Sequence, residues 1–402
     1  MPAITRRQML ALGCSAAASP LITPVAFASL PTDHRLVVII LRGAMDGLDV
    51  VQPYGDPALA RLRPGFDIGP DAGARDLDGF FALHPGLRDL WPLWQAGELG
   101  FAHAVSTPYR NARSHFDGQD LLEAGTGPGA DGRDGWLNRL VQTIPGATRE
   151  TALAVGRDEA LILRGSAPTS DWSPAARLLL SPATSDLLAA VYHDDPLFQA
   201  SFDEAQFLSG LLHGDFSEAE GDGMMEGMQA AMAGAGQAEA VNVIADFAAE
   251  RLRAEARIAS FSIGGWDTHR SQQGGLTRAL GHLSTAILRL RAGLGPYWGQ
   301  TTVLAMTEFG RTAAENGSGG TDHGTGSALI MAGGAVRGGR VLGDWPGLEE
   351  AALFDRRDLM PTRDIRAYAG WAMAGLFGTD RGALEGRVFP GLDLGADPGL
   401  LR

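Results

Sequence analysis

The stretch IASFSIGGWDTH, residues 258–269, joins the two features from which the fold can be inferred, a short apolar run and a polar loop directly after it. The run 258–263 has the length and composition of a buried β-strand, and two glycines end it. In an open α/β sheet, residues that follow a strand's carboxyl end face the crevice where ligands bind. Asp267 and His269 lie at that point, and both residue types bind zinc and related ions.

The same motif also fits the start of a helix. Asp267 and Thr268 are residue types whose side chains accept hydrogen bonds from the free amides of a helix's first turn. The sequence therefore predicts a metal site here only if other segments supply further ligands.

Short apolar runs recur along the chain and alternate with helical patterns, which favours an α/β fold with a central, mostly parallel sheet flanked by helices. The runs are 36–41, 99–105, 161–163, 258–263, 302–306 and 328–331. Long amphipathic stretches between about 185 and 255 interrupt this rhythm and predict a helical insertion. We expect a single domain over residues 29–402 that contains this insertion.

The first 28 residues have the order of a secretory signal peptide. The pair Arg6 and Arg7 precedes an apolar run, and Ala26-Phe27-Ala28 resembles a small-residue cleavage site. The adjacent arginines indicate export by the twin-arginine route, to the periplasm or outside the cell. A transmembrane anchor is the competing interpretation, but the run is short and rich in Ala and Ser. Lipidation at Cys14 is a minor alternative, so no stable membrane anchor is expected.

The composition excludes several classes of partner and mechanism. Cys14 is the only cysteine, so the mature chain would contain no disulfide. The formal net charge is −14, and loss of the two signal-peptide arginines makes it −16. Nucleic acid is therefore not an expected partner. No lysine occurs in the sequence, which excludes a catalytic lysine.

A second strand-end carboxylate follows the apolar run at 36–41. Asp46 lies in the turn RGAMDG, residues 42–47, where it would face the same crevice as Asp267. Its alternative role is to cap the next helix or close the turn. Asp49 is the substitute candidate for a metal ligand in this segment.

A third strand end carries Glu308 and Arg311, in the stretch TEFGRT at 307–312. Glu308 is a candidate metal ligand and Arg311 a candidate anion-binding residue. The alternative is that they form a salt bridge with each other or cap the next element. Asp322 and His323 follow within a glycine-rich loop, where glycine allows close backbone approach. The pair would bind metal, or one of them would orient the other.

The stretch SHFD at 114–117 follows the strand at 99–105 and is predicted to open a helix. At a helix amino terminus the dipole and free amides favour an ionised serine or a bound anion, so Ser114 is a candidate nucleophile. Its alternative role is an N-cap in a capping box with Asp117. His115 is a candidate for catalysis or for metal binding. Arg110 and Arg113 are candidates for holding the oxygens of an anionic ester.

Taken together, these motifs resemble those of an exported bacterial family numbered 1501, which has no established activity. The motifs, in order, are LRGAMDGL at 41–48, SHFD at 114–117, GWDTH at 265–269, TEFGRT at 307–312 and GTDHG at 320–324. That family is in turn similar to alkaline phosphatases, sulfatases and cofactor-independent phosphoglycerate mutases. The resemblance implies an alkaline-phosphatase-like α/β fold with a two-metal site and a serine, threonine or formylglycine nucleophile.

By the same resemblance, Asp46 corresponds to a metal-bridging aspartate, Ser114 to the nucleophile, and Asp267 with His269 to a ligand pair. The sequence departs from the superfamily at its Asp-His pair, which is replaced either by Glu308 and Phe309 or by Asp322 and His323. No histidine follows His323, which favours Glu308 and His323 as ligands. Ser106 has the wrong spacing for a formylglycine signature, so an activated serine is expected.

The resulting prediction is an exported hydrolase of phosphate or sulfate esters with Ser114 as nucleophile. It would use one or two divalent ions, zinc, manganese, calcium or magnesium, and act on a small anionic ester. The alternative is a non-catalytic metal-binding or scaffold protein with a degenerate site.

Overall fold

The computed structural model describes residues 32–110, 113–130, 134–156, 160–172 and 236–402. Their main feature is a nine-stranded sheet in the order β11-β5-β10-β9-β1-β8-β6-β7, with β12 also paired to β5. The strands are β1 (Arg35–Leu41), β5 (Leu99–Ser106), β6 (Ala152–Val155), β7 (Ser170–Trp172), β8 (Ile258–Ile263), β9 (Thr301–Thr307), β10 (Ser327–Ala332), β11 (Val341–Leu342) and β12 (Arg363–Asp364). Within these residues β10 runs against both of its neighbours, while the other pairings are parallel. The expected mostly parallel α/β sheet is therefore present.

The predicted strands at 36–41, 99–105, 258–263, 302–306 and 328–331 are confirmed. The predicted strand at 161–163 is wrong, because Leu161–Leu163 forms a 3₁₀ turn. Three apolar residues satisfy a strand pattern and a buried turn equally well, and here the turn packs Ile162 and Leu163 into the core. Strands β6 and β7, which extend the sheet beyond β8, were not predicted from the sequence.

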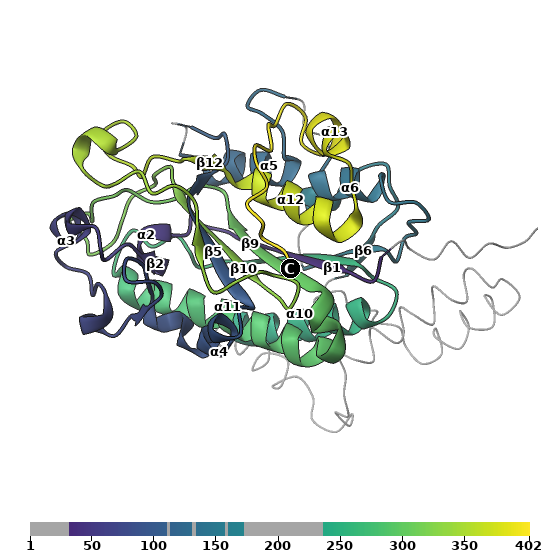
Figure 1. The fold of residues 1–402 in the computed structure, drawn as a ribbon, viewed down its shortest axis with the longest axis horizontal. Helices are drawn as coiled ribbons and strands as arrows, with labels where there is room; N and C mark the ends of the chain where they lie inside the picture. The colour runs from purple at the N-terminus through teal and green to yellow at the C-terminus, as the bar shows by residue number, and fades with distance from the viewer. Residues whose placement is uncertain (1–31, 111–112, 131–133, 157–159, 173–235) are drawn as a thin grey trace, which may run out of the picture.

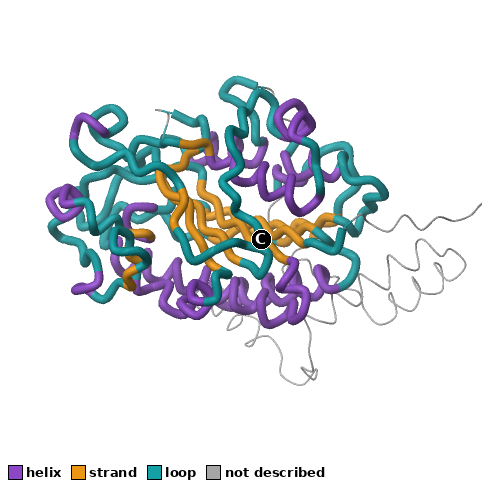
Figure 2. The backbone as a smooth tube through the Cα atoms, viewed as in Figure 1, coloured by secondary structure: helices purple, strands orange, loops and turns teal. Residues whose placement is uncertain are grey.

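Helices cover both faces of the sheet, as Figures 1 and 2 show. The helices are α2 (Gly47–Val50), α3 (Pro57–Leu62), α4 (Trp91–Gln95), α5 (His115–Ala124), α6 (Trp136–Val141), α10 (Gly236–Arg253), α11 (Gln272–Leu294), α12 (Ile365–Phe377) and α13 (Arg381–Ala383). Short 3₁₀ or π turns are η1 (Pro70–Ala72), η2 (Pro85–Leu90), η3 (Leu161–Leu163), η4 (Gly295–Gln300), η5 (Glu350–Ala352) and η6 (Leu384–Val388), and a small sheet joins β2 (Val51–Gln52), β4 (Ala82–Leu83) and β3 (Arg75–Asp76).

Strand β1 shows why the sheet is buried on both faces. Val37, Ile39 and Leu41 belong to the apolar core beneath α10 and α11. The alternate residues Leu36, Val38 and Ile40 belong to the core beneath α6 and α12. Because successive side chains of a strand point to opposite faces, a continuous apolar run supplies both cores at once.

The predicted insertion at about 185–255 is described only in its last part, where α10 packs against the sheet and α11. The rest of the insertion and the predicted signal at 1–28 lie outside the described residues. Among the described helices, we find none with the length and apolarity needed to span a membrane.

Candidate metal centre

Four loops meet at one edge of the sheet. Strands β1, β8 and β9 are parallel neighbours, so their carboxyl ends coincide, and β5 ends at the same edge because β10 reverses between β9 and β5. The loops that leave these ends are 42–46, 264–271, 308–326 and 107–114. Every site residue predicted from the sequence lies in or next to one of them. The fold thus brings together segments that are far apart in the chain.

His115, Asp267, His269 and His323, the central cluster, approach one another within these loops. Nε2 of His269 lies 3.0 Å from Nε2 of His323 and 3.1 Å from Oδ1 of Asp267. Nε2 of His323 is 3.4 Å from the same oxygen, and Nε2 of His115 is 3.5 Å from the other oxygen, Oδ2. The ligand atoms of His115, Asp267 and His323 all lie within 4.8 Å of one another. His115, Asp267 and His323 therefore share one centre, and His269 lies beside it in contact with Asp267 and His323.

Each of the three histidines is held on its opposite nitrogen, Nδ1, by an oxygen. His115 Nδ1 lies 2.8 Å from Glu308 Oε1, His269 Nδ1 lies 3.3 Å from Asp322 Oδ1, and His323 Nδ1 lies 3.1 Å from the carbonyl of Arg113. Because these oxygens accept hydrogen bonds, they favour a proton on Nδ1 and leave the Nε2 lone pair directed at the centre. This is the arrangement by which proteins prepare histidines to bind metal.

The spacing of His115, Asp267 and His323 fits a metal ion. A tetrahedral zinc site with bonds of about 2.0–2.1 Å has ligand atoms about 3.3–3.4 Å apart. The carboxylate of Asp267 lies 3.5 Å from Nε2 of His115 and 3.4 Å from Nε2 of His323. In addition, Nε2 of His115 is buried and has no hydrogen-bond partner among the described residues. A buried donor or acceptor without a partner is costly, and a bound cation would satisfy this one.

Arg311 holds Asp267 in place. Its guanidinium is buried and lies 2.7 Å from Asp267 Oδ1, and it also donates to backbone carbonyls of its own loop and of two other loops. Those carbonyls belong to Gly43, Ala44, Trp266 and Thr321. Although burial alone would raise the pKa of Asp267, the hydrogen bond and charge of Arg311 lower it. The predicted anion-binding role of Arg311 does not fit this position, because a guanidinium enclosed by protein carbonyls cannot contact a substrate.

Glu308 does not face the centre, contrary to its predicted role as a ligand. It is fully buried, and its Oε1 accepts hydrogen bonds from the amides of Gly43 and Ala44 and from Gln119. Burial opposes ionisation, but these bonds and the one from His115 lower the pKa of Glu308. The same contact raises the pKa of His115. Glu308 is therefore an ionised partner that orients His115.

Asp46 also lies away from the central cluster. It caps α2 by accepting from the amide of Leu48, and both carboxylate oxygens bind the guanidinium of Arg63, at 2.8 and 3.1 Å. Gln272 donates to it at 2.6 Å. Asp46 and Arg63 are each 1% exposed. The lone pairs that a metal would need are used inside the protein, so the capping alternative describes Asp46 better than the ligand role does.

Asp322 and Ser114 flank the central cluster. Asp322 binds Nδ1 of His269 rather than entering the centre, and the amide of Asn316 lowers the pKa of Asp322 by donating to it. Ser114 is the N-cap of α5, and its Oγ accepts from the amide of Asp117 at 3.4 Å, as the capping alternative predicts. That hydrogen bond is long, and the half-buried Ser114 lies directly beside His115.

Several residues that support the site were not predicted from the sequence. Arg63, Gln119 and Gln272 carry no motif. The fold brings Arg63 onto Asp46, 17 residues away, and brings Gln119 and Gln272 beside carboxylates that are 189 and 226 residues away. The two arginines near Ser114 also differ from each other. Arg110 is turned onto Ser106 and nearby carbonyls, whereas Arg113 lines a pocket. The histidines at 34, 84, 103 and 282 lie outside the central cluster, and those at 193 and 213 lie outside the described residues.

Three solved structures illustrate what the fold is similar to. A protein in the alkaline phosphatase superfamily from Vibrio parahaemolyticus is 12% identical over 82% of this chain and 69% of its own, with a TM-score of 0.36. The lipoteichoic acid synthase LtaP from Listeria monocytogenes is 9% identical over 91% and 76%, with a TM-score of 0.39. TAB5 alkaline phosphatase, in a mutant with magnesium bound, is 13% identical over 76% and 91%, with a TM-score of 0.30. Scores this low describe a partial likeness in fold and say nothing about activity.

No curated protein matches the sequence. A family model does match, and it covers residues 94–369, which is more than half of the chain and includes the whole central cluster. On this match the chain belongs to the family described as "Protein of unknown function (DUF1501)".

Proposed function

We propose that the protein is a metal-dependent hydrolase of anionic esters, of the phosphate or sulfate class, and that the central cluster binds one divalent ion. The observation that carries the proposal is the shared arrangement of His115, His269 and His323. Each presents Nε2 to the centre beside Asp267 while an oxygen holds its Nδ1.

The ligand types narrow the choice of metal. Three imidazoles and one carboxylate suit zinc or another transition ion better than calcium or magnesium, which prefer oxygen ligands. An ion of this kind, bound there, would act as a Lewis acid on an ester oxygen. Since His269 and Asp267 have side chains that are 40% and 48% exposed, a small substrate has access to the centre from solvent.

Ser114 is the proposed nucleophile. It adjoins a proposed ligand, His115, and its Oγ makes only one long hydrogen bond, to the backbone of its own helix. The amino terminus of the ten-residue α5 favours negative charge at this position. Ser114 Oγ would bond to phosphorus or sulfur as the alcohol leaves, and water would then release the serine.

A non-catalytic metal-binding protein is the second candidate, and one observation favours it. The buried pair Asp46 and Arg63 leaves no ligand at the place where the resemblance implies another metal. A single centre without a second ion would bind metal while lacking the full machinery of the two-metal hydrolases.

Metal analysis and turnover assays separate these candidates. We expect about one zinc-class ion per chain after loading, and hydrolysis within broad panels of phosphate and sulfate esters. The variant Ser114→Ala should retain the metal and lose turnover by several orders of magnitude. Full metal content with no turnover on any ester would reject the hydrolase and leave the non-catalytic protein. Absence of metal binding would reject both.

A matched control separates loss of the centre from general damage. His282→Asn changes a partly exposed histidine in the middle of α11, about 15 Å along the helix from its start near the site. It should leave metal content unchanged, whereas His323→Asn should lower it.

Export by the twin-arginine route is also proposed, on the sequence of residues 1–28 alone. Cell fractionation of the full chain should find it outside the cytoplasm. Replacement of Arg6 and Arg7 by lysine should retain it inside; an unchanged distribution would contradict the route.

A further inference from the structure

The carboxamide of Gln272, the first residue of α11, lies between the buried acid pair Asp46 and Asp49 and two loops of the central cluster. Its Nε2 donates to Asp46 Oδ2 at 2.6 Å and to Asp49 Oδ2 at 3.0 Å. Its Oε1 accepts from the hydroxyls of Thr268, at 3.0 Å, and Thr321, at 2.7 Å. Gln272 and Thr321 are fully buried, and Thr268 is 3% exposed. All four hydrogen-bonding positions of this amide are therefore used inside the protein.

The neighbouring groups fix the orientation of this amide. Both oxygens of Asp46 accept from Arg63, so the NH2 group of Gln272 must face the acid pair and its carbonyl must face the threonines. The hydroxyl of Thr321 has one proton, and the carbonyl of Gln272 at 2.7 Å is closer to it than Asp46 Oδ2 at 3.4 Å. Arg63 also donates to the carbonyl of Thr312, in the loop after β9. The amide is thus anchored on one side by a buried ion pair.

The two threonines lie next to the residues of the central cluster. Thr268 is between Asp267 and His269 in the sequence, and Thr321 is two residues before His323. The threonines belong to different loops, 264–271 and 308–326, and the amide of Thr321 also donates to the carbonyl of Thr268 at 3.3 Å. The carboxamide therefore bridges the loop of Asp267 and His269 to the loop of His323.

The relative position of these two loops sets the distances within the central cluster. Nε2 of His323 lies 3.4 Å from Asp267 Oδ1 and 3.0 Å from Nε2 of His269, and both contacts cross from one loop to the other. A metal site tolerates deviations of only about 0.2 Å in its bond lengths. Because the side chains of Asp267 and His269 are 48% and 40% exposed, buried contacts elsewhere in their loop have to hold them at that spacing.

From these observations we infer that Thr268, Thr321 and Gln272 are positioning residues, which hold the two loops at the spacing that metal binding requires. The inference rests on the metal binding in the proposed function and applies to the hydrolase and to the non-catalytic protein alike. Within the described residues, none of the three side chains bonds to a group of the central cluster, so they act through the loops. The acid pair then has a role that needs no second metal, because Asp46 and Asp49 orient the bridging amide.

Paired substitutions of the two threonines test the bridge. Thr321→Val and Thr268→Val keep the shape of each side chain and remove the hydroxyl, whereas Thr321→Ser and Thr268→Ser keep the hydroxyl. Zinc affinity of the full chain is measured by competition with a chelator, and the free energy of unfolding is measured on metal-free protein in urea. We expect each valine variant to lower zinc affinity about tenfold, and each serine variant to stay near the wild type.

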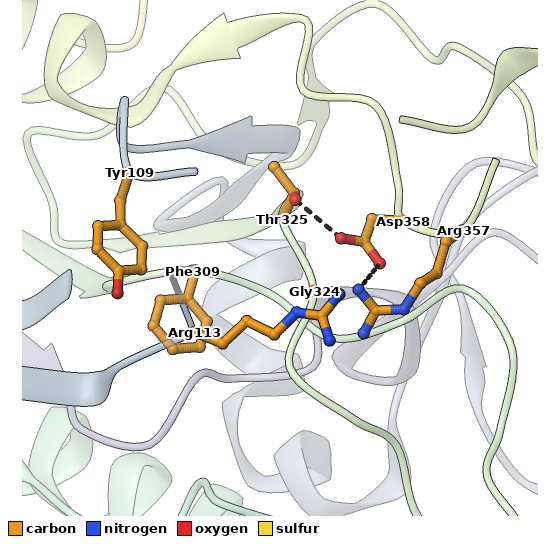
Figure 3. A pocket seen from close by; sticks show the side chains of 7 residues that line it. All are labelled: Tyr109, Arg113, Phe309, Gly324, Thr325, Arg357 and Asp358. Carbon is orange, nitrogen blue, oxygen red and sulfur yellow. Dashed lines mark hydrogen bonds and ion pairs between the residues drawn. The ribbon is translucent and has the colours of Figure 1, made fainter. Parts of the chain in front are cut away.

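Thr325→Val is the matched control. Thr321 and Thr325 lie two residues before and two residues after His323, and both are buried. The hydroxyl of Thr325 donates to Asp358 at 2.9 Å (Figure 3), which belongs to neither of the two loops. Its replacement should lower the free energy of unfolding as Thr321→Val does, because each loses one buried hydrogen bond. Zinc affinity should stay near that of the wild type.

Three outcomes would overturn the positioning role and leave the metal site in place. They are unchanged zinc affinity in both valine variants, an equal loss of affinity in Thr325→Val, and serine variants that bind as weakly as the valine variants. Absence of zinc binding in the wild type would overturn the metal-binding proposal together with this one. Ester turnover is measured on the same samples, so a protein that binds zinc as expected but hydrolyses no ester rejects only the hydrolase.

Discussion

Two carboxylate clusters lie at the same edge of the sheet and differ in how their charge is satisfied. Asp46 and Asp49 are buried, and Arg63, Gln272 and Gln52 occupy their oxygens. The central cluster has a partly exposed carboxylate, Asp267, facing three Nε2 atoms. Both clusters follow parallel strands, so in the sequence each is a carboxylate shortly after an apolar run.

The difference shows that a carboxylate at a strand end becomes a candidate ligand only if the protein leaves its lone pairs free. A guanidinium supplies the positive charge for Asp46. For the central cluster, the described residues supply one guanidinium, from Arg311. Carboxylate oxygens orient His115 and His269 through Nδ1. The first cluster is complete without a ligand, whereas the second leaves Nε2 of His115 unsatisfied.

The largest expected effect comes from breaking the buried cluster. Arg63→Met would leave Asp46 buried beside Asp49 without its cation, and removal of one partner of a buried pair costs about 3–5 kcal/mol. Urea denaturation should show this loss in the free energy of unfolding. Arg61→Met is the control, since its salt bridge with Glu349 is exposed and should contribute little. Equal losses in the two variants would contradict the comparison.

Metal binding at the central cluster should increase the stability of the fold. An ion bound with a free concentration 100 to 1,000 times its Kd stabilises the fold by about 3–4 kcal/mol. We expect zinc to raise the melting temperature of the wild type and chelator to reverse the rise. His323→Ala should abolish this response with little change in the stability of metal-free protein. A zinc response that survives in His323→Ala would show that the metal binds elsewhere.

Acid should lower the free energy of unfolding through His103, which is buried near Asp46 and Arg63. Burial lowers the pKa of His103 from 6.5 to about 4, and its ring is held between the carbonyl of Val51 and the amide of Ala104. The neutral form is favoured in the folded state, so its stabilisation is complete above pH 6.5 and is lost as the pH falls toward 4.

This loss amounts to at most about 3 kcal/mol. The difference in unfolding free energy between the wild type and His103→Gln, measured at several pH values, isolates it. A difference independent of pH between 6.5 and 4 would show that His103 is not the titrating group.

The smallest expected effect is on metal affinity, through Glu308, the partner of His115. Glu308→Gln keeps an oxygen acceptor for the amides of Gly43 and Ala44 but removes the charge that orients His115. Loss of such a supporting partner lowers metal affinity about 10–100-fold. Competition with a zinc chelator gives the affinity. If Glu308 were itself a ligand, the loss would match that of His323→Ala.

Local patterns determined much of the fold. Continuous apolar runs such as 36–41 and 258–263 can be buried on both faces only within a covered parallel sheet, so they were predictable from the sequence. The run 161–163 was too short to distinguish a strand from a turn. Strands β6 and β7 at the end of the sheet carry weaker signals, because only four and three residues pair there.

The sequence by itself identified the strand-end loops that meet at the edge of the sheet, and within them Asp267, His269, His323 and His115. It did so because strand position and ligand chemistry are properties of short segments. Tertiary structure alone decided which residues face the centre. It placed Arg63 on Asp46, turned Glu308 behind His115 and enclosed Arg311. Those outcomes depend on contacts between different loops, such as Arg63 with Asp46, 17 residues apart, and His115 with Glu308, 193 residues apart, which local spacing cannot encode.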